Sequence, residues 1–268
     1  MTRRVRILVL AGWTLAAIVA MALVPRIPQD QSYHNFADHR ALIGVPNFLN
    51  VVSNIPFLII GISGLVFLTQ SNSTKRLLTA PERLAYVTFF LAVSLTCFGS
   101  AHYHLSPNND RLVWDRLPMT IAFMSLLTCV ICERINAKAG LMLFTPLLMI
   151  GAGSVIYWYL SEARGSGDLR PYVVVQFYSG LAIALIAVMF RSRYTRGREL
   201  LIAMGLYVLA KVFEVLDPVV FNLGRIVSGH TLKHLAASVS IWCILRMLVR
   251  RVPKKHASDA WGYCARAR

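Results

Sequence analysis

The sequence predicts an all-α integral membrane protein: a bundle of seven transmembrane helices with one additional N-terminal hydrophobic helix. Hydrophobic residues make up 56% of the 268 residues, a share too high for a soluble domain of this size. They gather in blocks of about 18 or more residues with few charges, and about 20 apolar residues cross the hydrocarbon core of a bilayer. The blocks are residues 6–24, 47–69, 84–104, 112–132, 139–161, 171–190, 199–216 and 229–249.

The first block follows a basic start (TRRVR) and is typical of either a signal peptide or a membrane anchor. Its uninterrupted apolar length of about 18 residues favours a retained anchor. We therefore expect three parts. Residues 1–32 form an anchor or signal-like helix with an outer loop, residues 33–252 form the seven-helix domain, and residues 253–268 form a basic cytoplasmic tail.

The formal net charge of +16 indicates membrane topology. If the N-terminal stretch is cytoplasmic and successive helices alternate in direction, basic residues concentrate in the cytoplasmic segments, as the positive-inside rule requires. Both termini are then cytoplasmic. A nucleic-acid interface needs a basic face with base-reading groups; none is evident, so no nucleic-acid partner is expected. The cytoplasmic set includes Arg3, Arg4, Arg6, Lys75, Arg76, Arg83, Arg134, Lys138, Arg191, Arg193, Arg196, Arg198, Arg250 and Arg251.

Three blocks carry polar side chains that are costly inside a bilayer and therefore indicate function. The alternating topology places all of them near the outer interface. Ser100 and His104 end one helix, Asp115 lies in the first turn of the next, and His230 and His234 lie in the first two turns of the last. Residues four apart share a helix face, so the last two histidines can reach one ion. His102 points away from the face that Ser100 and His104 share.

These residue types predict a hydrolytic zinc site. Three neutral imidazoles leave one tetrahedral position open for water, and the metal lowers the pKa of that water to about 7. Asp115 could take its proton and deliver it to a leaving amine, while Ser100 could hydrogen-bond the oxyanion. One alternative is a haem-binding bundle, which leaves Asp115 and Ser100 without a role. Another is a non-enzymatic receptor or structural protein with a metal-bound helix bundle.

The order and spacing of these residues resemble the alkaline ceramidase family. That family belongs to a wider membrane hydrolase superfamily that includes the adiponectin receptors. The segment PNFLNVVSNIPF (46–57) is similar to the family's first core helix, with an asparagine-x-x-serine-asparagine element at Asn50, Ser53 and Asn54. The resemblance covers about residues 33–249. The matching pattern is Ser100-xxx-His104, Asp115 eleven residues later, and His230-xxx-His234.

The resemblance implies zinc on the three histidines and hydrolysis of the amide bond of a ceramide-like lipid embedded in the membrane. A tyrosine donor assists in the family, and Tyr172 is the matching position at the outer start of its helix. Family members also carry a calcium site before the first core helix. Here that stretch offers Asp38 and Asn47 as calcium ligands, although calcium prefers several carboxylates.

Other polar and aromatic residues lie near the same interface. Lys233, between the two histidines of the last helix, could meet a lipid phosphate or extend to the interface. Lys211, Glu214 and Asp217 follow one another at helical spacing and could pair among themselves or line a substrate cavity. Aromatic residues near outer helix ends are typical of an interfacial belt; they are Tyr103, Trp114, Trp158 and Tyr159.

Overall fold

The computed structural model describes residues 1–70 and 78–254. Most of the expected basic tail (255–268) and the topology residues Lys75 and Arg76 lie outside the described residues. The described part is helical, with no β-strand. Its elements are α1 (Arg3–Leu23), the 3₁₀ turn η1 (Gln31–His34), α2 (Phe48–Val52), α3 (Ile55–Gln70), α5 (Ala80–Leu105), α6 (Asn109–Arg134), α7 (Ala137–Ala163), α8 (Arg170–Met189), α9 (Arg198–Val215), α10 (Asp217–Gly224) and α11 (Gly229–Arg250).

All eight predicted apolar blocks are helical, and the prediction of an all-α membrane bundle is confirmed. Seven spans in the described part are long and apolar enough to cross a membrane, counting α2 and α3 as one. The eighth block, α9, has the necessary length but carries four charged residues: Arg198, Glu199, Lys211 and Glu214. Two of these charges face the site described below.

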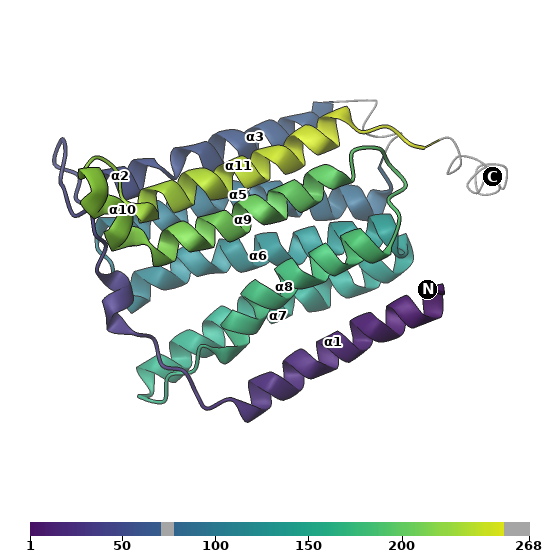
Figure 1. The fold of residues 1–268 in the computed structure, drawn as a ribbon, viewed down its shortest axis with the longest axis horizontal. Coiled ribbons are helices and arrows are strands. Elements are labelled where there is room, and N and C mark those ends of the chain that lie inside the picture. The colour runs from purple at the N-terminus through teal and green to yellow at the C-terminus, as the bar shows by residue number, and fades with distance from the viewer. Residues whose placement is uncertain (71–77, 255–268) are drawn as a thin grey trace.

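The helices lie roughly side by side, with α6 at the centre (Figure 1). Helix α5 packs between α3 and α6, helix α11 packs on α9 and α3, and α6 also contacts α7 and α8. In the most apolar window of α6, 72% of the residues are buried, against 0% in α1. Helix α1 packs against α8 at the edge of the bundle (Figure 1). The core is therefore built by the helices from α2 to α11, and α1 is an added helix at its edge.

The predicted block 47–69 is interrupted rather than continuous. Helix α2 starts after Asn47, whose φ of 49° is left-handed, and ends at a turn formed by Ser53 and Asn54. Pro56, in the first turn of α3, has no N–H to continue the hydrogen bonds of α2 and favours a helix start. The break lets polar side chains of this segment reach the neighbouring α11.

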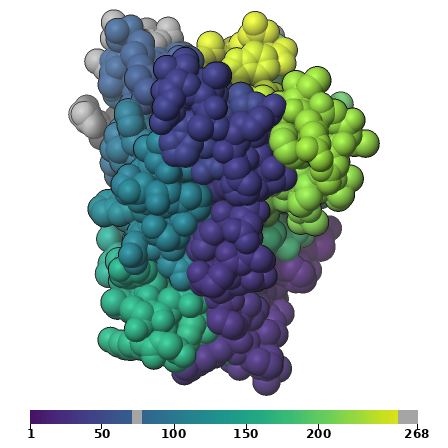
Figure 2. Space-filling view, turned by 90° about the vertical axis from the view of Figure 1, so that its left-hand side faces the viewer, coloured from purple at the N-terminus to yellow at the C-terminus, as the bar shows by residue number. Residues whose placement is uncertain are grey.

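The linker between α1 and α2 covers one end of the bundle. It crosses that end between the α5–α6 turn and α10 (Figure 2). Its backbone is fastened at several points: the Leu169 N–H donates to the Ile27 carbonyl over 2.8 Å, and the Ala37 N–H donates to Asp217 over 2.8 Å. The N-terminus and the end of α11 lie at the opposite end of the bundle (Figure 1).

Ion pairs close that opposite end. Glu82, which caps the start of α5 by a box with Thr79, binds Arg193 at 2.7 Å. Glu133, near the end of α6, binds Arg251 at 2.7 Å. Both carboxylates are buried, and a buried charge is stable only when it is paired and hydrogen-bonded. These contacts tie α5, α6 and the segment after α11 together.

A backbone contact sets how α5 and α6 meet beneath the covered end. A Cβ on Gly99 would lie 2.0 Å from the carbonyl oxygen of Trp114. Only glycine allows this approach. The contact lies one residue before Ser100 on one helix and one residue before Asp115 on the other, so it brings these two side chains together.

Gly99→Ala is expected to lower stability by about 1–3 kcal/mol, because the added methyl group pushes two helix backbones apart. The measurement is the thermal unfolding midpoint of the detergent-solubilised protein. Gly153→Ala on α7 is the matched control, since a Cβ there meets nothing within 4 Å. It should leave the midpoint unchanged or raise it. Equal behaviour of the two variants would contradict the packing argument.

Candidate metal and catalytic site

The three histidines predicted as metal ligands meet at the end of the bundle that the linker covers. One ligand atom from each of His104, His230 and His234 lies within 4.8 Å of the others. Their ring centroids are 4.8, 5.0 and 4.9 Å apart. Each residue is at most 4% exposed. Among the described residues, this is the group of histidine, cysteine and acidic side chains able to share an ion.

The surroundings of His104 fit a metal ligand. Both of its ring nitrogens are buried, and neither has a hydrogen-bond partner in the described protein. A neutral imidazole has one donor and one acceptor nitrogen, and leaving a buried polar atom unsatisfied costs about 1–3 kcal/mol. Coordination to a metal satisfies the lone pair. His102, by contrast, is exposed, in agreement with the choice of His104 from helical spacing.

Asp217 fixes the start of α11. Its Oδ1 accepts a 2.7 Å hydrogen bond from the His230 backbone N–H, and its Oδ2 accepts from Ala37 of the linker. Ser228 caps the helix by accepting from the Thr231 N–H. A Cβ on Gly229 would lie 2.3 Å from the Phe213 carbonyl oxygen, so glycine permits the close crossing of α11 and α9.

The Asn50–Asn54 element orients the second histidine of α11. The Ser53 Oγ lies 2.8 Å from His234 Nδ1, and the Ser53 hydroxyl donates to the Asn50 carbonyl over 3.2 Å. Ser53 therefore accepts from Nδ1–H, which leaves the His234 Nε2 lone pair free for a metal. The Asn50 amide oxygen accepts from Thr231 over 2.9 Å. The break between α2 and α3 thus supports α11 directly.

Aromatic and amide groups close the other sides of the cluster. The Phe36 ring of the linker packs on His104 and His230, with centroid distances of 4.7 and 4.5 Å. Asn47 donates to the His104 carbonyl over 2.9 Å. Phe36 is 4% exposed, so the linker covers the histidines at this end of the bundle.

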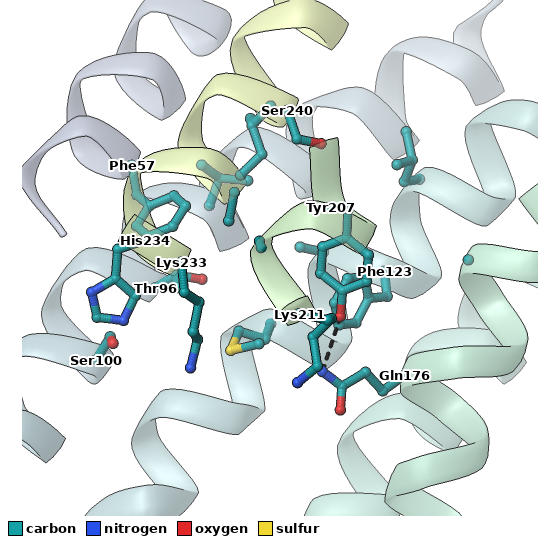
Figure 3. A pocket seen from close by; sticks show the side chains of 18 of the residues that line it. Phe57, Thr96, Ser100, Phe123, Gln176, Tyr207, Lys211, Lys233, His234 and Ser240 are labelled. Atoms are coloured by element: carbon teal, nitrogen blue, oxygen red, sulfur yellow. Dashed lines mark hydrogen bonds between the residues drawn. The ribbon is translucent and has the colours of Figure 1, made fainter. Parts of the chain in front are cut away.

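A cavity runs from His234 into the bundle. His234, Ser100, Asp115 and Tyr172 line its polar end, and Figure 3 shows Ser100 and His234 facing the same space. Ser100 and Asp115 lie close together, and both are buried. The deeper walls are apolar and come from α5, α6, α8, α9 and α11; they include Val93, Leu126, Ile183 and Ile244. The predicted site residues therefore gather at the polar end of an apolar cavity.

Lys233 also lines this cavity, so the structure favours the cavity over the interface for its side chain. Its Nζ donates to Glu214 Oε1 over 2.7 Å and lies 3.5 Å from His230 Nε2. Glu214 also pairs with Lys211. Lys211 and Glu214 pair with each other and also line the cavity. The two predicted alternatives, pairing and cavity lining, therefore do not exclude each other.

A comparison with protein families decides the assignment. The ceramidase family model matches residues 34–219. The chain belongs to the ceramidase family. This confirms the resemblance found from the residue pattern and supports a membrane hydrolase that acts on ceramide. A search of curated proteins gives no significant match. The matched region of this ceramidase-family protein ends before His230 and His234, which the fold brings to His104.

Arg116 is a site neighbour that the sequence analysis of this ceramidase-family chain missed. It is 4% exposed, and its guanidinium lies 4.3 Å from the Trp158 ring and 4.4 Å from the Tyr172 ring. One hydrogen bond, over 2.8 Å, goes from Arg116 to Gln29 of the linker.

The prediction of an interfacial belt was wrong for Trp158 and Tyr103, which are buried, whereas Trp114 is 59% exposed. The presence of Arg116 within a membrane helix could have indicated a buried aromatic partner such as Trp158, because a buried arginine needs a partner.

The calcium ligands expected from the family are engaged with protein groups. Arg40 donates to both carboxylate oxygens of Asp38 over 2.8 Å, and these hydrogen bonds hold the pKa of Asp38 below its usual value. The Asn47 amide oxygen lies 3.3 Å from His39 Nδ1. Asp38 and Asn47 therefore remain a prediction for calcium, and the contacts of Asp38 add no support to it.

Ser53→Ala is expected to weaken metal binding about 10- to 100-fold, because it removes the hydrogen bond that fixes the His234 tautomer. The measurement is metal content per protein after dialysis against a series of chelator concentrations. Ser63→Ala on α3 is the control, since Ser63 is exposed and bonds only within its own helix. A Ser53→Ala protein that retains metal as tightly as Ser63→Ala would show that Ser53 has no positioning role.

Proposed function

We propose that this protein hydrolyses the amide bond of a ceramide-like lipid in a zinc-dependent reaction. The observation that carries the proposal is the cluster of three buried imidazoles, of which His234 lines the same apolar cavity as Asp115. His104, His230 and His234 would hold the zinc ion, since imidazole nitrogens suit this metal. A zinc ion held there would act as a Lewis acid and would lower the pKa of a water molecule to about 7.

Asp115 is the proton carrier in this proposal. A buried carboxylate beside the ligands can accept the proton of the attacking water and pass it to the amide nitrogen as the C–N bond breaks. The products are a fatty acid and a lipid amine. Ser100 lies beside Asp115 and has one hydroxyl proton. It would donate this proton to the Asp115 carboxylate before the reaction, and to the charge that develops on the carbonyl oxygen once Asp115 has taken the proton of water. Tyr172 lines the same space and is a second donor.

The apolar walls of the cavity suit the hydrocarbon chains of the substrate. They extend from the polar end towards the middle of the bundle between α5, α6, α8, α9 and α11. Ligand cavities of this kind are mostly apolar, with a few polar groups that fix orientation. A chain held there would present its amide group at the polar end, where the histidines and Asp115 converge.

We further assign the site to the outer side of the membrane and both termini to the cytoplasm. The basic residues of the N-terminal stretch and of the end of α11 support this orientation through the positive-inside rule. They lie at the end of the bundle away from the histidines (Figure 1). Tagging each terminus and testing protease access in sealed vesicles measures the orientation directly.

The double variant His230→Ala, His234→Ala is expected to lose zinc, because two of three ligands are removed and one imidazole holds the ion weakly. Metal analysis of the purified protein should give about one zinc per wild-type chain and a background value for the variant. Retention of stoichiometric zinc by the double variant would refute the ligand assignment. A haem band in the visible spectrum would refute the zinc centre altogether.

Asp115→Asn is expected to lower amide hydrolysis about 10²- to 10⁴-fold, the usual contribution of a general acid–base group, while zinc content stays at the wild-type level. The assay is fatty acid release from ceramide in mixed micelles. Asp110→Asn is the control on the same helix, because Asp110 is exposed and bonds to Tyr159 away from the cavity. Unchanged turnover by Asp115→Asn would contradict the mechanism. A metal-loaded wild type that hydrolyses no lipid amide would favour the receptor or structural alternative.

A further inference from the structure

Two ammonium groups face the cavity beside the histidines. Lys233 and Lys211 come from α11 and α9, and Figure 3 shows both side chains directed into the same space below His234. Their side chains are 14% and 26% exposed. An ammonium group in an apolar membrane cavity is costly and by default indicates function. The two lysines therefore need an explanation that the hydrolysis of a neutral amide does not supply.

The two lysines share one carboxylate, Glu214. It accepts from Lys233 over 2.7 Å and from Tyr33 over 3.1 Å, and its other oxygen pairs with Lys211. Glu214 is thus fully engaged by its three partners. A lysine ammonium has three donors. Glu214 takes one donor of Lys233, and His230 Nε2, at 3.5 Å, lies at the limit for another. At least one donor remains for a ligand in the cavity.

The charge balance of the site with zinc bound also indicates a negatively charged ligand. The charged side chains that line the cavity are Asp115, Lys211, Glu214 and Lys233, whose formal charges cancel. The zinc ion of the proposed function adds two positive charges. Arg116, next to the cavity, adds a third, and its Nε and Nη1 have no hydrogen-bond partner in the described protein. A buried excess of one sign is unfavourable unless an opposite charge pairs with it.

We propose that Lys233, supported by Lys211, forms an anion-binding subsite for the headgroup of the substrate. The substrate class is then an N-acyl lipid of the ceramide type with a negatively charged headgroup, a phosphate or a sulfonate. In such a lipid the amide nitrogen and the anionic headgroup are attached to neighbouring carbon atoms. Lys233 directly precedes His234, and its Nζ lies next to His230, so an anion bound there keeps the amide at the metal ligands. This inference rests on the proposed function.

The test compares three N-acyl lipids with the same acyl chain: neutral ceramide, ceramide 1-phosphate and a sulfonate analogue. Wild type should show a higher kcat/KM for both anionic lipids than for ceramide. Lys233→Met should lower that anionic-to-neutral ratio by about tenfold or more, as expected when one partner of a buried charge pair is removed. The loss should lie mainly in KM, and Lys233→Arg should keep a ratio above one. Lys138→Met, an exposed lysine at the start of α7, is the control.

A binding measurement separates this inference from the proposed function. Asp115→Asn protein, with or without Lys233→Met, is mixed with each lipid or with inorganic phosphate, and the thermal unfolding midpoint is recorded. A larger rise with anionic lipids than with ceramide, abolished by Lys233→Met, supports the subsite even if no lipid is cleaved; in that case the hydrolase proposal alone fails. Equal rises with neutral and anionic lipids, or no rise, overturn the subsite. A full rise with inorganic phosphate alone overturns the assignment to a lipid headgroup.

Discussion

The polar groups at the histidine end have to satisfy one another, because the hydrocarbon of a membrane offers no hydrogen-bond partner. Asp217 illustrates the consequence: one carboxylate holds both the linker, through Ala37, and the start of α11, through His230. The same carboxylate that fastens the linker therefore also positions His230, a proposed metal ligand. Ser53 acts likewise on His234. Stability and site geometry depend on the same few buried bonds, so neither can change without the other.

The opposite end of the bundle holds buried ion pairs, whereas the site end holds the cluster of three histidines. Glu82 and Glu133 bind Arg193 and Arg251 and satisfy buried charge locally, with no opening into the cavity. At the site end, His104 keeps two nitrogens without partners, and Lys233 keeps a donor for the cavity. At the site end, the groups without a protein partner thus lie where an ion and a substrate can pair with them.

Much of the fold could be predicted from the sequence, because membrane helices are recognised by their length and apolarity. Helical spacing was also sufficient to bring His230 and His234 to one face and to choose His104 over His102. Three features could not be predicted: the break between α2 and α3 at Ser53, the bonds of Asp217, and the aromatic rings around Arg116. Each depends on contacts between residues far apart in the chain: Ser53 with His234, Asp217 with Ala37, and Arg116 with Trp158. A periodic pattern within one helix carries no information about such contacts.

The contact at Gly99 explains why a short pattern of residues predicts a site formed by three helices. Helices α5 and α6 are antiparallel neighbours joined by a tight turn, and Gly99 meets the backbone of Trp114. This contact sets the register of the two helices. The next residue on each helix, Ser100 or Asp115, therefore lies close to the other, and His104 follows Ser100 by one turn. The spacing between His104 and Asp115 is therefore the length of a hairpin in this register. A residue inserted in that turn that shifted this register would leave both helices apolar and yet separate Asp115 from Ser100, so the spacing carries the geometry of this pair.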